Sequence, residues 1–409
     1  MTSDQRGPSV PNVLLWVHSG EALGHNSRIT TIAEELAAAG LNVSLLFHGE
    51  NDDRMLPFSS ETYGRCARLD SLATNTRTSP VGDESAVIEA GLNFVNQSGP
   101  FDALVTEFWP FSRRIYDGFL VALIDRMREQ KSELKLYSVV RDIATSSMAS
   151  PHGGMSAVLE RDPRGWAAAN LAGVFIASDG RIEATSIPDS LRDFAEFVGY
   201  VARRPDTTPS PTKRDKVLAT AGGSLWYWAE PEDATRYFGP FLQAAKHPPL
   251  ALAQLEWHLL IPPNCTPTDW SNLSRMADEV TRTTVRLRRG FIPNSQFRKL
   301  VSESQVVLSR GGMNTILDCF VMGTPVVVFD PTCNLERCTR SKAFLKSNVI
   351  QKYFPEGTMD SGELARALVT SIELKHSQQG RAASLNMNGA RKIADRVSAD
   401  TRAGRAGPR

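Results

Sequence analysis

Short, continuously apolar runs alternate with longer amphipathic stretches along most of the chain, and this alternation restricts the possible folds more than any other feature. The first run, Val13–Val17, has no polar residue, which is typical of a strand buried on both faces of a parallel sheet. The following segment, 27–39, places Ile29, Ile32 and Leu36 on one helical face, and Gly40 ends it. Such alternation predicts parallel strands joined by crossover helices.

The alternation occurs twice. Apolar runs at 41–47, 103–106, 136–140, 173–177 and 196–199 extend a first α/β half. The stretch 203–214 then contains three prolines and no aliphatic or aromatic side chain, which predicts an exposed linker. Strand-like runs return at 217–220, 257–260, 284–287, 305–309 and 325–329, with helices predicted at 231–246 and 314–321. The fold class is therefore α/β, with two doubly wound parallel sheets.

The length of 409 residues also favours two domains, each large enough to bury a core. The pattern predicts a first domain at 13–202, a linker at 203–214 and a second domain at 215–375. A further helix is expected within 376–397, with its helical pattern from Arg381 onward. The polar segment 1–12 and the small, basic segment 398–409 are expected to be disordered.

Composition excludes several kinds of protein. Lys and Arg number 46 against 45 Asp and Glu, and this balance argues against a nucleic-acid binder. The 5 Cys have irregular spacing and form no C-x-x-C pair, as expected for reduced thiols in a cytoplasmic protein. No secretory signal precedes the first strand, and no apolar run approaches the roughly 20 residues of a membrane span. Peripheral membrane contact and the oligomeric state stay open.

The strongest local signal is the glycine turn between the strand 305–309 and the helix that follows it. Gly311 and Gly312 let backbone N–H groups approach a ligand closely, and the start of a helix favours an anion such as a diphosphate. Asn314 and Thr315 add side-chain donors there. The alternative is a tight strand-to-helix turn with nothing bound.

Polar residues follow this turn in the same helix and after the next strand. Asp318 is placed to accept both hydroxyls of a ribose, or it is a solvated helix residue. Beyond the strand 325–329, Glu336 is a candidate acceptor of sugar hydroxyls, while Arg337 and Arg340 face either phosphate or water. Ligands of open α/β sheets collect at this carboxyl edge, which favours a binding site in the second half.

The loop after the first strand carries His25 just before a helix, and it matches neither a Rossmann glycine fingerprint nor a phosphate-binding P-loop. An imidazole there can remove a proton from a hydroxyl or a water, although a helix-capping or core histidine is the alternative. The seven His show no metal-ligand spacing and no D-x-D pair occurs, so neither a metal nor another cofactor is predicted.

Carboxylates also end two other predicted strands of the first half. Glu107 follows the strand 103–106, and Asp142 follows the strand 136–140. Either carboxylate would orient His25 or contact a substrate. The alternative is a buried ion pair, because a charge at a buried strand end is costly unless it is paired. The candidate partners are Arg113, Arg114 and Arg141.

Three stretches resemble the GT-B glycosyltransferases that have a family 28 C-terminal domain. Segment 24–28, Gly-His-Asn-Ser-Arg, matches the G-H-x-x-R entry of that family, and 106–114 with 140–143 is similar to a bacterial group of predicted glycosyltransferases. Segment 308–329, continued by 336–340, is similar to the donor-site signature. More distant resemblances are to the peptidoglycan lipid-linked N-acetylglucosaminyltransferase and to the UDP-sugar hydrolase of pseudaminic acid synthesis.

The resemblance implies two Rossmann-like domains facing a cleft, the first binding an acceptor hydroxyl and the second a nucleotide sugar, with a UDP-sugar expected. The chain departs from the family at Asp318, where a Glu is usual, and at Arg337, where a Gln is usual. The change at Arg337 leaves the identity of the sugar open. The implied acceptor contacts are Arg113, Arg114 and Arg141. The implied donor contacts are Gly222, Gly223, Ser224, Arg310, Gly311, Gly312, Asn314 and Thr315 for the diphosphate side, Asp318 for ribose, the backbone of Phe291 and Ile292 for the base, and Glu336, Arg337 and Arg340 for the sugar side.

The activity that the resemblance implies is metal-independent, inverting hexosyl transfer. His25, or failing that Glu107 or Asp142, would take the proton from the acceptor hydroxyl as it attacks the anomeric carbon. Two alternatives remain on the same scaffold, a nucleotide-sugar hydrolase in which His25 activates water, and a nucleotide-sugar-binding protein without catalysis.

Overall fold

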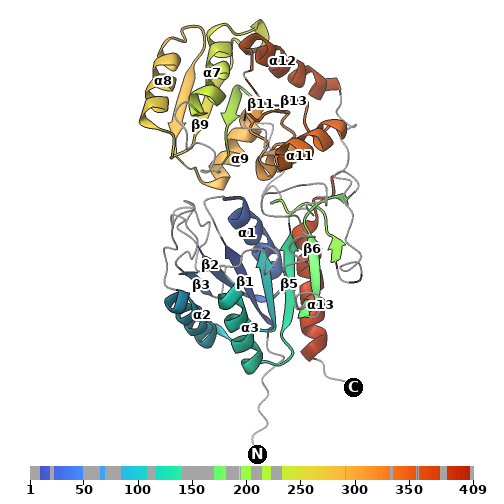
Figure 1. Cartoon of the computed structure of the whole chain (residues 1–409). Coiled ribbons are helices and arrows are strands. Elements are labelled where there is room, and N and C mark those ends of the chain that lie inside the picture. The colour runs from blue at the N-terminus through green and yellow to red at the C-terminus, as the bar shows by residue number, and fades with distance from the viewer. Residues whose placement is uncertain are drawn as a thin grey trace, which may run out of the picture. The chain divides into compact units, whose positions relative to one another are not determined.

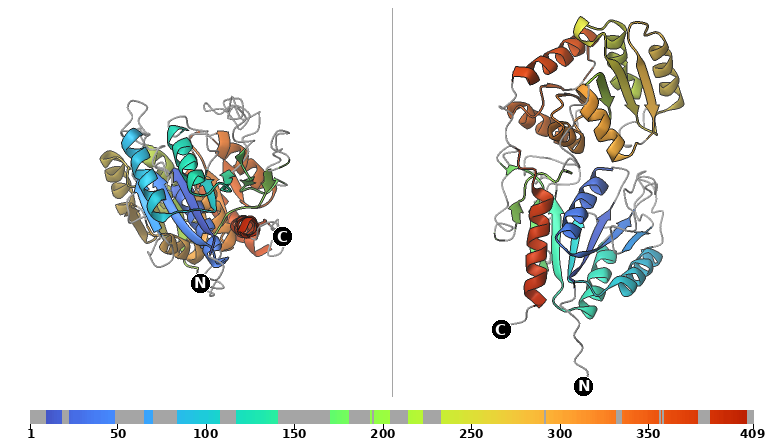
Figure 2. Two further views of the ribbon diagram at one scale, coloured as in Figure 1. Left: turned by 90° about the horizontal axis from the view of Figure 1, so that it is seen from below. Right: turned by 180° about the vertical axis from the view of Figure 1, so that it is seen from behind.

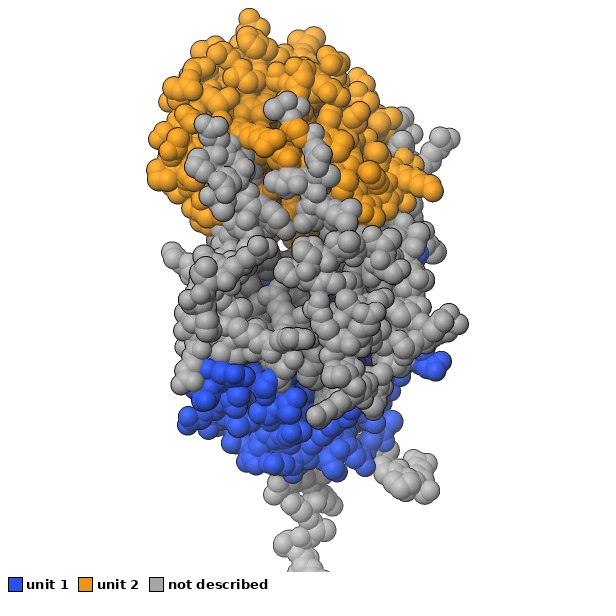
Figure 3. Space-filling view, in the orientation of Figure 1, with its two compact units in different colours: residues 1–20, 25–201, 385–409 blue, residues 21–24, 202–384 orange. Residues whose placement is uncertain are grey.

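The computed structural model of the chain describes residues 10–18, 23–48, 65–69, 84–107, 117–140, 170–180, 193, 195–203, 214–222, 233–290, 292–331, 335–355, 357, 359–377 and 385–405. The chain divides into two compact units (Figure 3). Unit 1 comprises Met1–Gly20, His25–Val201 and Leu385–Arg409, and unit 2 comprises Glu21–Gly24 and Ala202–Ser384.

Unit 1 is built on a seven-stranded sheet with the order β3-β2-β1-β4-β5-β6-β7 (Figure 1), and each described strand pair in it is parallel. The inner strand β1 is buried along residues 11–17, as its unbroken apolar run predicts. The strands are β1 (Asn12–His18), β2 (Asn42–His48), β3 (Arg65–Leu69), β4 (Ala103–Glu107), β5 (Lys135–Val140), β6 (Gly173–Ile176) and β7 (Ala195–Phe197).

Helices cover both faces of this sheet (Figures 1 and 2). Leu14 and Trp16 of β1 pack in one core with helices α2 (Glu84–Ser98) and α3 (Asp117–Gln130). The alternate β1 residues, including Leu15, pack in a second core with α1 (Leu23–Ala38) and α13 (Gly389–Arg405). The two cores confirm the doubly wound α/β architecture.

The C-terminal helix α13 belongs to unit 1, although the chain has passed through unit 2 before reaching it. The Tyr137 hydroxyl donates to Asp400 Oδ2 at 2.7 Å, and Thr401 is buried. The expected disorder from residue 398 is therefore wrong as far as Arg405, and the helix begins at Gly389 rather than at Arg381. The sequence of this helix is rich in small and charged residues, so the apolar pattern alone does not predict which of its faces is buried or how far it extends.

Unit 2 contains a six-stranded sheet with the order β10-β9-β8-β11-β12-β13, again with parallel pairs. Its strands are β8 (Lys216–Thr220), β9 (Glu256–Ile261), β10 (Val285–Arg289), β11 (Ser304–Ser309), β12 (Val326–Phe329) and β13 (Lys352–Phe354). Its helices are α7 (Asp233–Lys246), α8 (Pro267–Asp278), α9 (Asn294–Glu303), α10 (Met313–Val321), α11 (Leu335–Lys346) and α12 (Ser361–Ser377), with the short 3₁₀ helix η5 (Leu250–Leu252). Residues of α7, α8 and α12 share a core with one face of the sheet. Outside that core, α9 contacts β8 and β11, and α10 contacts β11 and α9.

Two boundaries differ from the sequence prediction, and two strands were not predicted. Asn12 is not disordered but opens β1, and its backbone N–H donates to Asp102 Oδ2 at 2.7 Å. Arg214, expected in the linker, is bonded to the end of α10, while 204–213 lie outside the described residues. The edge strands β3 and β13 were not predicted, because five and three residues of mixed polarity carry too little pattern.

No helix in the described part of the chain is both long and apolar enough to cross a membrane.

Candidate functional site

The strand order of unit 2 creates a switch point between β8 and β11, the two central strands. From these neighbours the sheet is built outward in opposite directions, so the loops after them diverge and leave a crevice at the carboxyl ends. Gly222 follows β8, and the turn 310–312 follows β11. The predicted glycine turn therefore lies at the position in the sheet where ligands bind in folds of this kind.

Both loops at the switch point begin in the same way. Gly222 has φ +76° and donates its N–H to Thr220 Oγ1 at 3.1 Å. Gly311 has φ +89° and donates its N–H to Ser309 Oγ at 3.2 Å. A positive φ strains any residue with a side chain, so glycine is needed at both turns for this conformation.

The two glycine loops converge on Thr315 in the first turn of α10. A Cβ built on Gly222 would lie 4.0 Å from Thr315 Oγ1, and one built on Gly312 would lie 3.9 Å from it. A Cβ on Gly311 would meet Val328 Cγ1 at 3.1 Å. The backbone is thus closely packed beneath the turn, and Gly222, Gly312 and Thr315, all predicted donor residues, are brought together.

The two ends of helix α10 differ in how side chains cap them. Gly312 is its N-cap and provides no side-chain hydrogen bond to the first-turn N–H groups. At the other end, the Arg214 guanidinium donates to Met322 O at 2.8 Å and to Gly323 O at 3.1 Å. The C-terminal carbonyls are therefore capped by a cation, whereas the N-cap residue supplies no side chain to the positive N-terminus.

A buried cluster of charges lies beside the glycine turn. Asp330 follows β12 and is fully buried, with Arg310 Nε 3.6 Å and Arg337 Nη1 3.4 Å from its Oδ1. Arg340 is also buried, with 4% of its surface exposed. Arg310, Arg337 and Arg340 were predicted for this site, but Asp330 was not. Its signal was available, since a carboxylate directly after an unbroken apolar strand must be paired.

Tyr237 supports the same region from the core of unit 2. Its hydroxyl donates to Thr220 O at 3.0 Å, and its ring stacks on Phe329 with centroids 5.8 Å apart. Burial raises the pKa of the Tyr237 hydroxyl, so it stays protonated and keeps this hydrogen bond. Tyr237 therefore links the end of β8 to the end of β12 below the turn 310–312.

Asp318, the predicted ribose ligand, lies on α10 with 21% of its side chain exposed. Burial raises the pKa of this carboxyl to about 6, although Arg298 and Arg203 act in the opposite direction. Arg298 Nε lies 3.5 Å from Asp318 Oδ1, and Arg298 is itself buried. Asp318 is therefore a carboxylate at neutral pH that becomes protonated in mildly acidic solution.

The carboxyl edge of unit 1 has a switch point between β1 and β4. Glu107 ends β4, is fully buried, and accepts a hydrogen bond from Arg28 Nη1 at 2.5 Å. Arg28 lies on α1 one turn after His25, which is inside the helix because α1 begins at Leu23. An ion pair was one of the two predictions for Glu107, but the partner within the described residues is Arg28, from the G-H-x-x-R segment.

Only some of the remaining predicted site residues belong to the described part of the structure. Ile292 does, and it follows β10 and Gly290 in the segment predicted to meet the base. The side chains of His25 and Glu336 are outside the described part of the structure, although their backbones lie in α1 and α11. The residues wholly outside it are Arg113, Arg114, Arg141, Asp142, Gly223, Ser224 and Phe291.

Among the residues that the structure describes, no group of three or more His, Cys, Asp or Glu is arranged to hold a metal ion.

Comparison with protein-family models and with curated sequences finds no match. Solved structures do match over nearly the whole chain. Arabidopsis thaliana UGT89C1 complexed with UDP has a TM-score of 0.60 at 15% identity, over 96% of this chain and 99% of that one. Acinetobacter baumannii MurG has a TM-score of 0.54 at 14% identity, over 95% and 100%. The glycosyltransferase of kitacinnamycin has a TM-score of 0.56 at 14% identity, over 97% and 98%.

The chain has the GT-B fold. Its two parallel sheets of seven and six strands correspond to the two Rossmann-like domains of these glycosyltransferases. At identities of 11–15% the likeness establishes the fold alone, so the site must be argued from this chain's own residues.

Proposed function

We propose that the chain is a glycosyltransferase that moves a hexose from a nucleotide sugar, with a UDP-sugar as the expected donor, to an acceptor hydroxyl. The observation that carries this proposal is the pair of glycine turns at the switch point of unit 2, beside the N-terminus of α10. Backbone N–H groups at such a helix start suit a diphosphate. The fold shared with UGT89C1 complexed with UDP supports the same assignment.

The donor is proposed to lie along the carboxyl edge of the unit 2 sheet. The diphosphate is held by the turn 311–312 and Thr315, and the ribose hydroxyls by the Asp318 carboxylate. The base is proposed to lie against the segment after β10, near Ile292. The sugar is proposed to face α11, where Arg337 and Glu336 stand, although the Arg337 guanidinium already lies 3.4 Å from Asp330.

Catalysis is proposed to depend on a general base of unit 1 and on leaving-group stabilisation by unit 2. His25 would take the proton from the acceptor hydroxyl as its oxygen forms a bond to the anomeric carbon and the bond to the diphosphate breaks. The fixed N–H dipoles of α10 and the buried arginines would stabilise the charge that grows on the diphosphate, without a metal ion. An attack from the face opposite the leaving group inverts the anomeric carbon.

The roles of the two unit 1 carboxylates differ. Glu107 is already bonded to Arg28, so we assign it the positioning of α1 and its His25 rather than proton transfer. Asp142 remains the alternative general base.

The proposal is tested by incubating the full chain with a panel of nucleotide sugars, with and without a mixture of hydroxyl acceptors. Nucleotide release that requires an acceptor is expected, and His25→Ala should abolish it while UDP binding persists. Rapid release without an acceptor would instead show a hydrolase, and binding without turnover would show a non-catalytic binding protein.

A further inference from the structure

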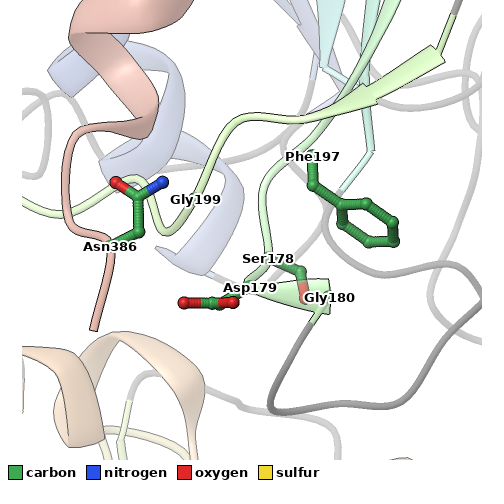
Figure 4. Close-up of a pocket in the computed structure, with 6 residues that line it drawn as sticks. All are labelled: Ser178, Asp179, Gly180, Phe197, Gly199 and Asn386. Atoms are coloured by element: carbon green, nitrogen blue, oxygen red, sulfur yellow. The ribbon is translucent and has the colours of Figure 1, made fainter. Parts of the chain in front are cut away.

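Accessibility separates two groups of polar side chains that lie outside the glycine turn. In unit 1 a pocket lies at the carboxyl ends of β6 and β7, between the turn 178–180, Phe197 and Asn386 (Figure 4). The Ser178 hydroxyl in its wall is fully buried, so a ligand in the pocket cannot reach that group. In unit 2, by contrast, 21% of the Asp318 side chain is exposed, so a ligand can reach its carboxylate.

Asp318 has both the position and the free acceptor capacity to bind hydroxyl groups. It lies on the helical face that begins at the glycine turn, because it follows Asn314 by four residues and Thr315 by three. Its Oδ1 lies 3.5 Å from Arg298 Nε, at the outer limit of a hydrogen bond. A carboxylate accepts about four hydrogen bonds. The ion pair with Arg298 therefore leaves acceptor positions for the hydroxyls of a ligand.

A backbone carbonyl holds the guanidinium of Arg298. Its Nη2 donates to Arg203 O at 3.3 Å, and its side chain is only 9% exposed. Helix α9, which carries Arg298, packs against α10. Because a guanidinium is planar and its donors have fixed directions, the hydrogen bond to Arg203 O restricts where Nε can lie. Arg298 therefore presents Nε to Asp318 while it is itself nearly inaccessible to a ligand.

The charges around Asp318 decide how much of it is a carboxylate. Burial raises the pKa of this carboxyl to about 6, whereas Arg298 and Arg203 act to lower it. The neighbouring Cys319 thiol adds no charge, because burial raises its pKa well above the usual range. Removing Arg298 would raise the pKa of Asp318 further, toward neutral pH, so that less of the carboxylate form would be present.

The stability of the fold gives little reason for this ion pair. The cost of removing two charges from water offsets most of their attraction, so such a pair contributes little net stability. The effect on a ligand is larger, because only the carboxylate form can accept hydrogen bonds from two hydroxyls through both of its oxygens.

We propose that Arg298 is a positioning residue for the ribose of the donor: it keeps Asp318 ionised and directs the carboxylate toward the ribose hydroxyls, without touching the nucleotide itself. This inference rests on the proposed function, because it places the ribose at Asp318. Arg298 then determines how strongly the site prefers a nucleotide with both ribose hydroxyls over one that lacks them.

The test compares UDP with 2′,3′-dideoxy-UDP by calorimetry on the full chain, between about pH 5 and about pH 8.5. The second ligand has the same phosphates but no ribose hydroxyls, so the ratio of the two affinities is independent of phosphate titration. In the parent protein the preference for UDP should fall as the pH drops through about 6. In Arg298→Met this fall should begin about one pH unit higher, and the preference should recover at about pH 8.5.

Four further variants separate the charge of Arg298 from its packing. Arg298→Gln is a second neutral variant that keeps an amide donor, and it should give the same shift. Arg298→Lys keeps the charge and should keep the parent's pH profile. Lys299→Met removes a charge from the next residue, but Lys299 is 73% exposed, so its profile should also match the parent's. In an Asp318→Asn background, Arg298→Met should no longer change the profile.

Two results would overturn the inference while UDP still binds. One is an unchanged pH profile in the two neutral variants at Arg298. The other is a preference for UDP that these variants lose equally at every pH, because a merely distorted site would behave in that way. Failure of both ligands to bind the parent protein would instead refute the proposed donor site, and this inference with it.

Discussion

The carboxyl edges of the two sheets have the same strand order at their centres but use different chemistry. In unit 2 the loops at the switch point turn at glycines, with a positive φ at Gly222 and Gly311 and with Gly312, which has no side chain, as the N-cap of α10. In unit 1 it is formed by side chains, with Glu107 bonded to Arg28. Backbone N–H groups can hydrogen-bond an anion whatever their side chains are, whereas a side-chain ion pair depends on both of its residues. The unit 2 edge therefore suits the diphosphate of the proposed donor, and the specificity of the unit 1 edge depends on individual side chains.

The largest loss of stability is expected when Glu107, at the carboxyl edge of the unit 1 sheet, loses its buried ion-pair partner. Arg28→Met leaves the fully buried Glu107 carboxylate without its arginine and should lower the free energy of unfolding by about 3–5 kcal/mol. Denaturant unfolding would measure the loss. Adding Glu107→Leu should restore most of the stability, and a single variant as stable as the parent would contradict the buried ion pair.

The next largest effect is a loss of UDP affinity when a glycine of the unit 2 turn is substituted. Gly311→Ala should weaken UDP binding more than tenfold, because its Cβ would meet Val328 Cγ1 at 3.1 Å and shift the turn. Gly323→Ala is the matched control, since Gly323 also has a positive φ of +59° but has nothing within 4 Å of its Cβ. Both changes should cost about 1–2 kcal/mol of stability from φ strain. Equal UDP affinities in the two variants, measured by calorimetry, would remove Gly311 from the site.

A smaller effect is expected at the opposite end of α10. Arg214→Ala removes the bonds to Met322 O and Gly323 O and should lower stability by about 1–2 kcal/mol, with little change in UDP affinity. Lys299→Ala serves as the control, because Lys299 is 73% exposed and its pair with Glu303 should contribute almost nothing. A strong loss of UDP binding in Arg214→Ala would mean that the cap also shapes the donor site.

The smallest effect is a pH dependence at Asp318. In the proposed site the carboxylate form of Asp318 accepts ribose hydroxyls, so UDP affinity should fall a few-fold as the pH drops below about 6, the raised pKa of this carboxyl. The phosphate also titrates near pH 6, so the dependence must be compared with that of Asp318→Asn. In stability the sign is reversed, because the folded state keeps its proton to higher pH than the unfolded chain and loses that advantage as the pH rises through 6. Identical pH profiles for both proteins would exclude Asp318 as a ribose ligand.

Much of unit 2 could be predicted because its signals are local. The apolar strand 305–309 and the glycine turn after it are adjacent in sequence, and together they predicted β11 and the start of α10. The pairing of Asp318 with Arg298 could not be predicted, because it joins two helices across a strand and a turn.

Unit 1 was less predictable for the same physical reason. The sequence located Glu107 at a strand end, but not its partner Arg28, which is 79 residues away. The pocket around Ser178 and Asn386 joins segments about two hundred residues apart, so no local pattern could have shown it. The buried course of α13 was missed because Ser398 and Thr401 face the core with small polar side chains.

A crystal structure of the full chain with UDP would show directly whether a nucleoside diphosphate binds at the start of α10. We expect the diphosphate oxygens within hydrogen-bond distance of the backbone N–H groups after Gly311, with the ribose beside Asp318. A diphosphate bound elsewhere on the chain, with the glycine turn unoccupied, would contradict it.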